Sequence, residues 1–226
     1  MIMAADRPVL GIHTATSRTG LALISGAAVL ADAGFNRPLS PSAALMPMMK
    51  TMLQVAGMKL GDLGALAVTV GPGGVTGIRV GLATARTLAE AAELPLAGVS
   101  TLAAVAAAAG PVSMPVAPWL DGGRGEIYAA LFRSVDEPGD ERVSPPAEIL
   151  SGLPAEPLLF VGDGAIRYGE LIAGRPQAHP GDRVKPTPGG LAAAAAFLGR
   201  DALARGTALP PMPRYLRPPD ATRARA

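Results

Sequence analysis

The sequence of 226 residues contains no cysteine. This absence excludes disulfides, a thiolate nucleophile and any metal site built on thiolates. Only two histidines occur, His13 and His179, so a zinc site would need carboxylates for its remaining ligands. Aromatic residues make up 4% and charged residues 17%, against 49% hydrophobic residues, so a folded core must be aliphatic. This composition also excludes collagen, coiled coils and charged disordered chains.

Charge of either sign is scarce in most of the chain and is almost balanced. Residues 1–210 hold 16 Lys and Arg against 17 Asp and Glu, so this part does not resemble a basic nucleic-acid binder. The tail, residues 211–226, carries Arg214, Arg217, Arg223 and Arg225 against Asp220. Either the tail contacts the phosphates of a nucleic acid or it is a loose solvated end.

A long uncharged run is present but is repeatedly interrupted. The 27 residues 94–120 carry no charge, which is long enough for a membrane span. Four prolines break this run, so it is better interpreted as strand, helix, loop and strand of a buried core. The first eight residues contain Asp6 and Arg7 and no basic region before an apolar run, so we do not expect them to act as a signal peptide. We therefore expect a soluble, cytoplasmic protein without a membrane association.

Apolar runs and turn residues predict an α/β chain in which strands and helices alternate. The expected strands cover residues 8–16, 63–70, 96–99, 115–120, 126–133 and 158–162, and residues 20–30 should hold a further strand and a turn at Ser25-Gly26, with another strand after it. The expected helices cover 42–55, 76–93, 103–109 and 191–205. Ser40 and Pro41 should open the first helix. The polar, proline-rich residues 136–156 are expected to form a surface loop. The second half restarts as strand, turn and strand, with Asp121 in the place of His13, which suggests an internal duplication.

The most specific local feature is the run Gly71-Pro72-Gly73-Gly74-Val75-Thr76-Gly77, which follows a strand and opens a helix. A helix start of this kind can bind an anion, so Gly71, Gly73, Gly74, Thr76 and Gly77 are candidates for holding a phosphate. The run departs from a P-loop because no Lys follows, and from the dinucleotide fingerprint because Thr76 replaces the third glycine. The alternative is a tight turn whose glycines allow close packing.

Other catalytic arrangements are weaker. Ser100 lacks the second glycine of a nucleophile elbow, and nothing in the sequence brings His13 and His179 to a serine. His13 follows an apolar strand and is expected to be a hydrogen-bonded, half-buried side chain. Asp121, Arg124 and Glu126 surround a turn, where they either bind a cation or a phosphate or form internal ion pairs.

Four segments, in order along the chain, resemble the TsaB (YeaZ) family, whose members belong to the bacterial machinery that makes threonylcarbamoyladenosine in tRNA. The first is residues 12–16 and the second is the glycine segment with the following helix and Gly98-Val99-Ser100-Thr101-Leu102. The others are residues 121–128, ending Gly-Glu-Ile-Tyr, and Arg214-Tyr215-Leu216-Arg217. The resemblance implies a fold like actin, Hsp70 and sugar kinases, with duplicated α/β lobes and a reduced C-terminal lobe. The lobes are expected at residues 1–110 and 111–210, followed by the basic tail.

The resemblance also implies a subunit that is not itself an enzyme and needs no cofactor or metal. In the family, a TsaD-type subunit catalyses the transfer and a TsaE-type ATPase joins the pair. The TsaD contact would use the first two helices, residues 42–55 and 76–93. The expected partner-binding residues are Leu45, Met49 and Met52 on one helix and Arg79, Leu82, Arg86 and Glu90 on the other. The methionines have an alternative interpretation as core residues, and exposed apolar helices predict self-association when the chain is alone.

Two departures from the family pattern bear on function. His13 stands where the family has Asp, and imidazole is a poor ligand for Mg²⁺. Gly74-Val75 replaces a Ser-Phe pair. The alternatives to a scaffold subunit are an independent nucleotide-binding enzyme of the same fold and a glycoprotease-like peptidase.

Overall fold

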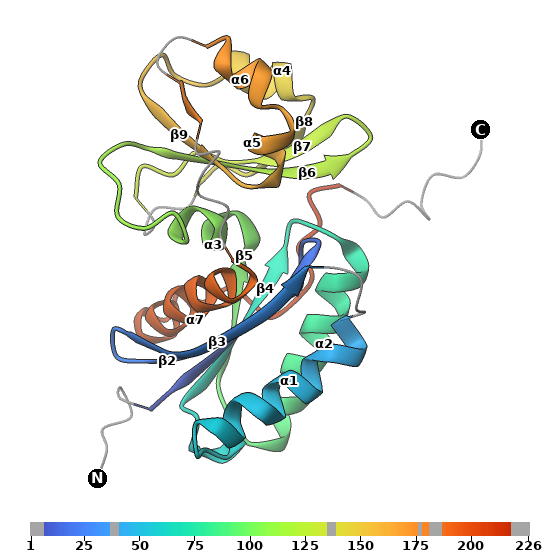
Figure 1. Cartoon of the computed structure of the whole chain (residues 1–226), viewed down its shortest axis with the longest axis vertical. Helices are drawn as coiled ribbons and strands as arrows, with labels where there is room; N and C mark the ends of the chain where they lie inside the picture. The colour runs from blue at the N-terminus through green and yellow to red at the C-terminus, as the bar shows by residue number, and fades with distance from the viewer. Residues whose placement is uncertain (1–6, 37–40, 135–138, 176–177, 181–186, 218–226) are drawn as a thin grey trace, which may run out of the picture.

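A computed structural model describes residues 7–36, 41–134, 139–175, 178–180 and 187–217. Two five-stranded sheets form two lobes, one above the other in Figure 1. The first sheet has the strand order β3-β2-β1-β4-β5. Its strands are β1 (Val9–His13), β2 (Arg18–Ser25), β3 (Ala28–Asn36), β4 (Ala65–Gly71) and β5 (Leu96–Ser100). The central strands β1 and β4 are buried along their whole length, as their apolar runs predict.

The second sheet repeats the topology of the first. Its strand order is β10-β9-β6-β7-β8, where β6 pairs antiparallel with β7 and parallel with β9, just as β1 pairs with β2 and β4. Its strands are β6 (Val116–Gly123), β7 (Glu126–Ala129), β8 (Arg142–Ser144), β9 (Leu158–Val161) and β10 (Ala178–Pro180). The duplication expected from the sequence is therefore visible in the strand order, and the shorter strands make the second lobe the reduced one.

Helices cover both faces of the first sheet. On one face lie α1 (Pro41–Val55) and α2 (Val75–Ala91), joined by a short 3₁₀ helix (Leu60–Asp62) and β4. On the other face lies α7 (Pro188–Arg205), whose run of buried alanines packs on β1, β2 and β4. Between the lobes, α3 (Thr101–Ala107) contacts both α7 and β6. The second lobe adds α4 (Pro146–Ser151), α5 (Asp163–Arg167) and α6 (Gly169–Ala173).

Two expectations about organisation need correction. We expected residues 111–210 to form the second lobe, but α7 packs on the first sheet, because its small side chains let it lie close to the sheet surface (Figure 1). We expected residues 136–156 to be a loop, but β8 and α4 lie within them. Ser40, expected to open the first helix, is outside the described residues. The uncharged run 94–120 is divided among β5, α3 and β6. Within the ranges described, no helix combines the length and apolar character needed to cross a bilayer.

Candidate functional site

A cavity of about 430 Å³ lies between the lobes, where the equivalent strands β1 and β6 end. The first lobe contributes the β1–β2 connection and the glycine segment before α2. The second lobe contributes Leu120 and Asp121 of β6 and Asp163 at the start of α5. The topology thus brings together the glycine segment and Asp121, which the sequence singled out separately.

The glycine segment packs against the β1–β2 connection. A Cβ atom at Gly73 would overlap the carbonyl oxygen of Ala15, and one at Gly77 would overlap that of Thr14. The amide of Gly74 donates to the Ala15 carbonyl at 2.7 Å, and the Thr14 hydroxyl donates to the Gly77 carbonyl at 2.7 Å. These contacts account for the glycines by close packing, and they occupy the Gly74 amide that a phosphate would need.

His13 is fully buried rather than half-buried, and it is neutral. Its Nε2 atom lies 2.9 Å from the Thr16 hydroxyl and its Nδ1 atom lies 3.2 Å from the Thr69 hydroxyl. Burial, with the positive charge of Arg18 as a smaller cause, lowers the pKa of His13 to about 3. A neutral imidazole engaged through both nitrogens connects β1 to the following turn and to β4.

The acidic side chains of the cleft belong to the second lobe. Asp163 accepts a hydrogen bond from the Asp121 amide at 3.0 Å, and burial raises the pKa of the Asp163 carboxyl. Asp121 forms an ion pair with Arg167 at 2.8 Å, and Glu126 forms one with Arg217. Asp121 and Glu126 thus form ion pairs within the chain, but with Arg167 and Arg217, which lie outside the cluster of Asp121, Arg124 and Glu126 that the sequence singled out.

The lining of the cleft does not favour a nucleotide phosphate. It combines apolar side chains, among them Phe35, Val75 and Leu120, with hydroxyl groups, backbone and the two carboxyl groups of Asp121 and Asp163. The lining residues that the structure describes include no Lys or Arg. Carboxylates repel phosphate unless a cation lies between them. The described residues also contain no group of three or more His, Asp or Glu side chains placed to hold a metal ion.

The helix pair α1 and α2 presents different residues from those we expected. The side chains of Leu45, Met49, Met52 and Leu82 are buried against the first sheet, with exposed fractions of 1%, 6%, 6% and 3%. They form the core face of the helices and are not a contact surface in this conformation. The sequence pattern identified an apolar face correctly, but this face meets the chain's own sheet.

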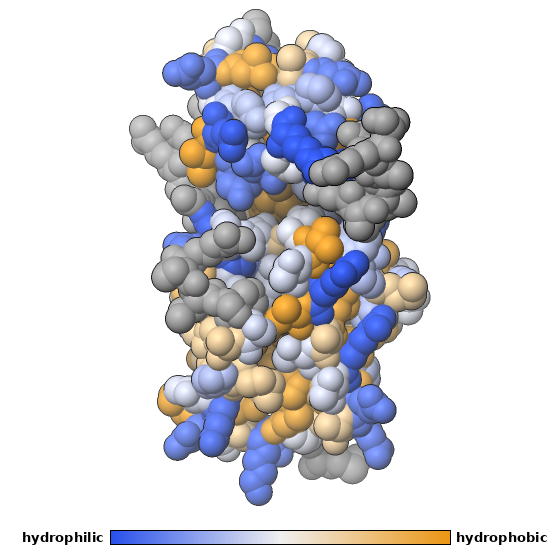
Figure 2. All heavy atoms as spheres, turned by 90° about the vertical axis from the view of Figure 1, so that its right-hand side faces the viewer, coloured by the Kyte–Doolittle hydropathy of each residue, from blue (hydrophilic) through white to orange (hydrophobic). Residues whose placement is uncertain are grey.

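The charged members of that set are exposed on α2. Arg79, Arg86 and Glu90 all lie on the outer face. Arg79 donates to the hydroxyl of Tyr215 at 3.1 Å, and Arg86 donates to the carbonyl of Pro211 at 2.9 Å. Figure 2 shows hydrophilic and apolar side chains interspersed on the side of the molecule that carries α2. Two of the expected contact residues therefore hold the chain's own C-terminal segment.

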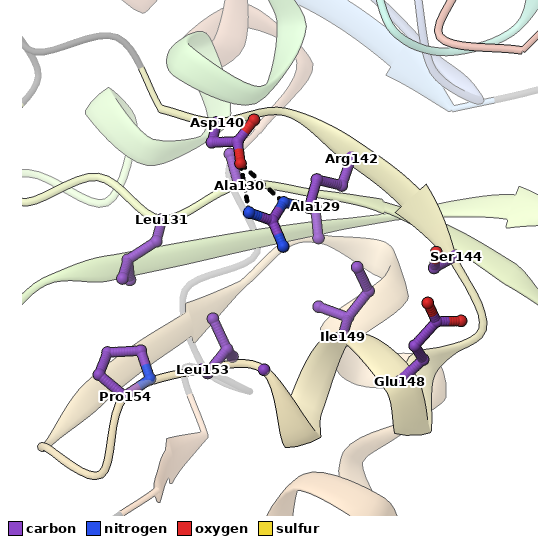
Figure 3. Close-up of a pocket in the computed structure, with 11 residues that line it drawn as sticks. Ala129, Ala130, Leu131, Asp140, Arg142, Ser144, Glu148, Ile149, Leu153 and Pro154 are labelled. Carbon is purple, nitrogen blue, oxygen red and sulfur yellow. Dashed lines mark hydrogen bonds and ion pairs between the residues drawn. The ribbon is translucent and has the colours of Figure 1, made fainter.

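Sequence reasoning missed two features of the second lobe. Glu141 is almost completely buried, accepts a hydrogen bond from Ser100 and pairs with Arg214 at 3.0 Å. A cavity of about 510 Å³ lies between β7, β8 and α4, with Ile149 and Leu153 on one side and the Asp140–Arg142 ion pair at its rim (Figure 3). Glu141 and the β8 and α4 side of the cavity lie at residues expected to form a loop, because the polar side chains and prolines of residues 136–156 show no helical or strand periodicity.

Comparisons with known proteins agree with this architecture. The family model for TsaD, tRNA N6-adenosine threonylcarbamoyltransferase, matches residues 41–168. The chain belongs to the TsaD family, in its TsaB (YeaZ) group. The TsaB protein of Escherichia coli, described as a tRNA threonylcarbamoyladenosine biosynthesis protein, is 38% identical over 130 residues, which cover 57% of this chain and 52% of that protein. The chain spans about half the length of the curated TsaB relatives that it matches.

Solved structures extend the likeness over most of the chain. YeaZ from Pseudomonas aeruginosa superimposes with a TM-score of 0.76 at 28% identity, over 92% of this chain and 99% of that one. A ROK hexokinase from Thermus thermophilus superimposes with a TM-score of 0.52 at 12% identity, over 88% and 100% of the two chains. The fold is therefore of the actin, Hsp70 and sugar-kinase type, as expected.

Proposed function

We propose that this chain is a non-catalytic subunit that pairs with a TsaD-type enzyme, with a TsaE-type ATPase joining the pair, for threonylcarbamoylation of the adenosine beside the anticodon of tRNA. One observation carries this proposal. The likeness to YeaZ covers 92% of the chain at 28% identity, which is far closer than the likeness to a sugar kinase of the same fold. We also propose that this assembly acts in the cytoplasm.

The cleft between the lobes supports a subunit without transferase activity of its own. The resemblance places an Asp at the position of His13, and here that position holds a buried neutral imidazole. The Gly74 amide of the glycine segment is occupied by Ala15. Both observations favour a cleft used for packing rather than for holding a nucleotide with Mg²⁺.

The partner would contact the outer surface of the helix pair α1 and α2. On α1 this surface offers Met46, which is 48% exposed, beside the exposed Lys50. On α2 it offers Glu90, with Arg79 and Arg86 already held by the C-terminal segment. The exposed Met46 beside a charged side chain suits contact with a partner helix that presents both apolar and charged side chains.

The decisive experiment mixes this chain with the TsaD-type protein of the same genome and measures mass by size exclusion with light scattering. A 1:1 species is expected, together with modification of unmodified tRNA by the complete mixture and none by this chain alone. Met46→Asp should weaken pairing at least about tenfold, because a charge would be desolvated in an apolar contact.

Leu171→Asp is the matched control, because Leu171 is also apolar, on a helix and 39% exposed, but it lies in the second lobe. It should pair like the parent. Equal loss of pairing in both variants would exclude the helix pair as the contact surface. Absence of any complex, with both proteins folded, would overturn the proposed function itself.

A further inference from the structure

The C-terminal segment, residues 207–217, crosses from one lobe to the other after α7. In the first lobe it is held by backbone hydrogen bonds, which require no particular side chain. The Gly98 amide of β5 donates to the Leu209 carbonyl at 2.9 Å, and the Arg214 amide donates to the Val70 carbonyl of β4 at 2.8 Å. The segment therefore forms one isolated antiparallel bridge with the edge strand β5 and then reaches the end of β4.

Helix α2 holds the same segment through two arginines. Arg86 donates from Nε and Nη2 to the Pro211 carbonyl, at 2.9 and 2.5 Å, and Arg79 donates from Nε to the Tyr215 hydroxyl at 3.1 Å. The two arginines are seven residues apart, so both project from one side of the helix. The outer face of α2 is thus connected directly to the C-terminal segment.

The end of the segment is fixed to the second lobe. Arg217 donates to the Gly122 carbonyl at 3.0 Å and forms an ion pair with Glu126, so it holds the turn between β6 and β7. Arg214 pairs with the buried Glu141 at 3.0 Å. Between Arg214 and Arg217 in the sequence, Tyr215 packs against the core of the first lobe and Leu216 packs against the core of the second.

We propose that residues 207–217 form a clasp that fixes the two lobes relative to each other and couples the outer face of α2 to the cleft. Helix α2 holds the segment at Pro211 and at Tyr215 itself, and the β6–β7 turn holds it at Arg217, just after Leu216. Any partner that takes Arg79 or Arg86 away from the clasp therefore loosens the hold on the second lobe. This inference rests on contacts within the chain and stands whether or not the proposed TsaD-type partner is correct.

The test measures the distance between the lobes in the full-length chain. Because the sequence has no cysteine, Gln54→Cys on α1 and Leu171→Cys on α6 can be spin-labelled at exposed sites without a background. Pulsed electron resonance should give one narrow distance distribution for the parent. Tyr215→Phe combined with Arg217→Gln keeps the aromatic packing but removes the hydroxyl and the ion pair, and should broaden that distribution about twofold.

Hydrogen exchange gives a second readout that does not depend on labels. In the same double variant, amides of residues 119–129 should exchange about tenfold faster, because charged hydrogen bonds hold this hairpin. Arg142→Gln, which breaks an ion pair confined to the second lobe, is the matched control and should change neither readout.

A second double variant tests the clasp without altering any residue of the C-terminal segment. Arg79→Gln and Arg86→Gln together alter only exposed side chains of α2, and they should also speed exchange at residues 119–129, which lie in the other lobe. A parent-like distance distribution and parent-like exchange in the folded variants would overturn the clasp. If the double variant of Arg79 and Arg86 exchanged faster only in the first lobe, the proposed coupling between the outer face of α2 and the second lobe would be wrong.

Discussion

The Nδ1 atom of His13 lies 3.2 Å from the hydroxyl of Thr69, and this contact joins the two central parallel strands of the first lobe beside the cleft. The other ring nitrogen contacts Thr16 at 2.9 Å. In a neutral imidazole one nitrogen donates and the other accepts, so both threonine hydroxyls are satisfied without a charge. The connection that His13 makes between the two strands therefore depends on the imidazole remaining unprotonated.

This connection predicts a loss of stability in acid. An unfolded histidine binds a proton near pH 6.5, whereas folded His13, with its pKa lowered to about 3, does not. Between these two pH values the unfolded state therefore binds more protons than the folded state. The contribution of neutral His13 to the free energy of unfolding is complete above pH 6.5 and is lost as the pH falls. His13→Gln does not titrate. Between pH 6.5 and 4.5 the parent should lose about 2–3 kcal/mol more than this variant in urea unfolding.

The comparison with His13→Gln removes the opposing contributions of other groups. The pKa values of Asp163 and Glu141 are raised, mainly by burial, so their contributions change in the opposite direction, but both proteins contain them. If parent and variant lost the same free energy over this range, folded His13 would have to titrate normally.

Burial of the α1 methionines predicts a contrast between neighbouring turns of one helix. Met52→Asp places a carboxylate in the core of the first lobe and should reduce the free energy of unfolding by about 3–5 kcal/mol. Met46→Asp alters an exposed position and should change it by less than about 0.5 kcal/mol. Thermal or urea unfolding of the isolated chain measures both. A stable Met52→Asp variant would show that this methionine is accessible after all.

The fold was predictable where the signal was local. The strands β1, β4 and β9 are short apolar runs bounded by turn residues, and the sequence places each of them within a few residues. The missed β8 and α4 are only three and six residues long, so they are too short for a periodic pattern to mark them. The docking of α7 on the first sheet is a contact between distant parts of the chain, which a helical pattern alone does not encode.

The site was predictable only in part, for a related reason. An apolar stripe containing Met49 and Met52 shows that a helix buries one face, but the stripe is the same whether a sheet of its own chain or a partner covers it. The glycine segment left phosphate binding and close packing open. Deciding between them required the position of Ala15, which lies far from Gly73 in the sequence.

The glycine segment itself supplies a matched pair of substitutions. Gly73→Ala would bring a Cβ into the Ala15 carbonyl at a φ of +151°, so it should reduce the free energy of unfolding by about 1–3 kcal/mol. Gly74→Ala would place its Cβ at 3.7 Å from the same oxygen, an ordinary contact, and should have little effect. Urea unfolding distinguishes them, and equal stability of the two variants would contradict the packing role of Gly73.

Ser100 connects helix capping to the buried Glu141, and this predicts an effect that depends on pH. Its hydroxyl oxygen accepts from the Ala103 amide at 3.2 Å and caps α3, while the hydroxyl donates to Glu141. Burial raises the pKa of Glu141, and the interactions with Ser100 and Arg214 lower it by a smaller amount. Ser100→Ala should therefore raise this pKa further, while removing a cap that contributes about 1 kcal/mol.

The sign of the pH dependence follows from the raised pKa. A carboxyl group whose folded pKa exceeds its unfolded value of 4.5 favours the folded state at low pH, and this advantage is lost as pH rises through the folded pKa. Urea unfolding of Ser100→Ala should therefore show a larger loss at pH 7 than at pH 4, where mainly the cap is missing. Ser100→Thr keeps the hydroxyl and should lose much less at both values. An equal loss for Ser100→Ala at pH 4 and pH 7 would mean that the serine acts through the cap alone, and that the Glu141 carboxylate is stabilised by Arg214.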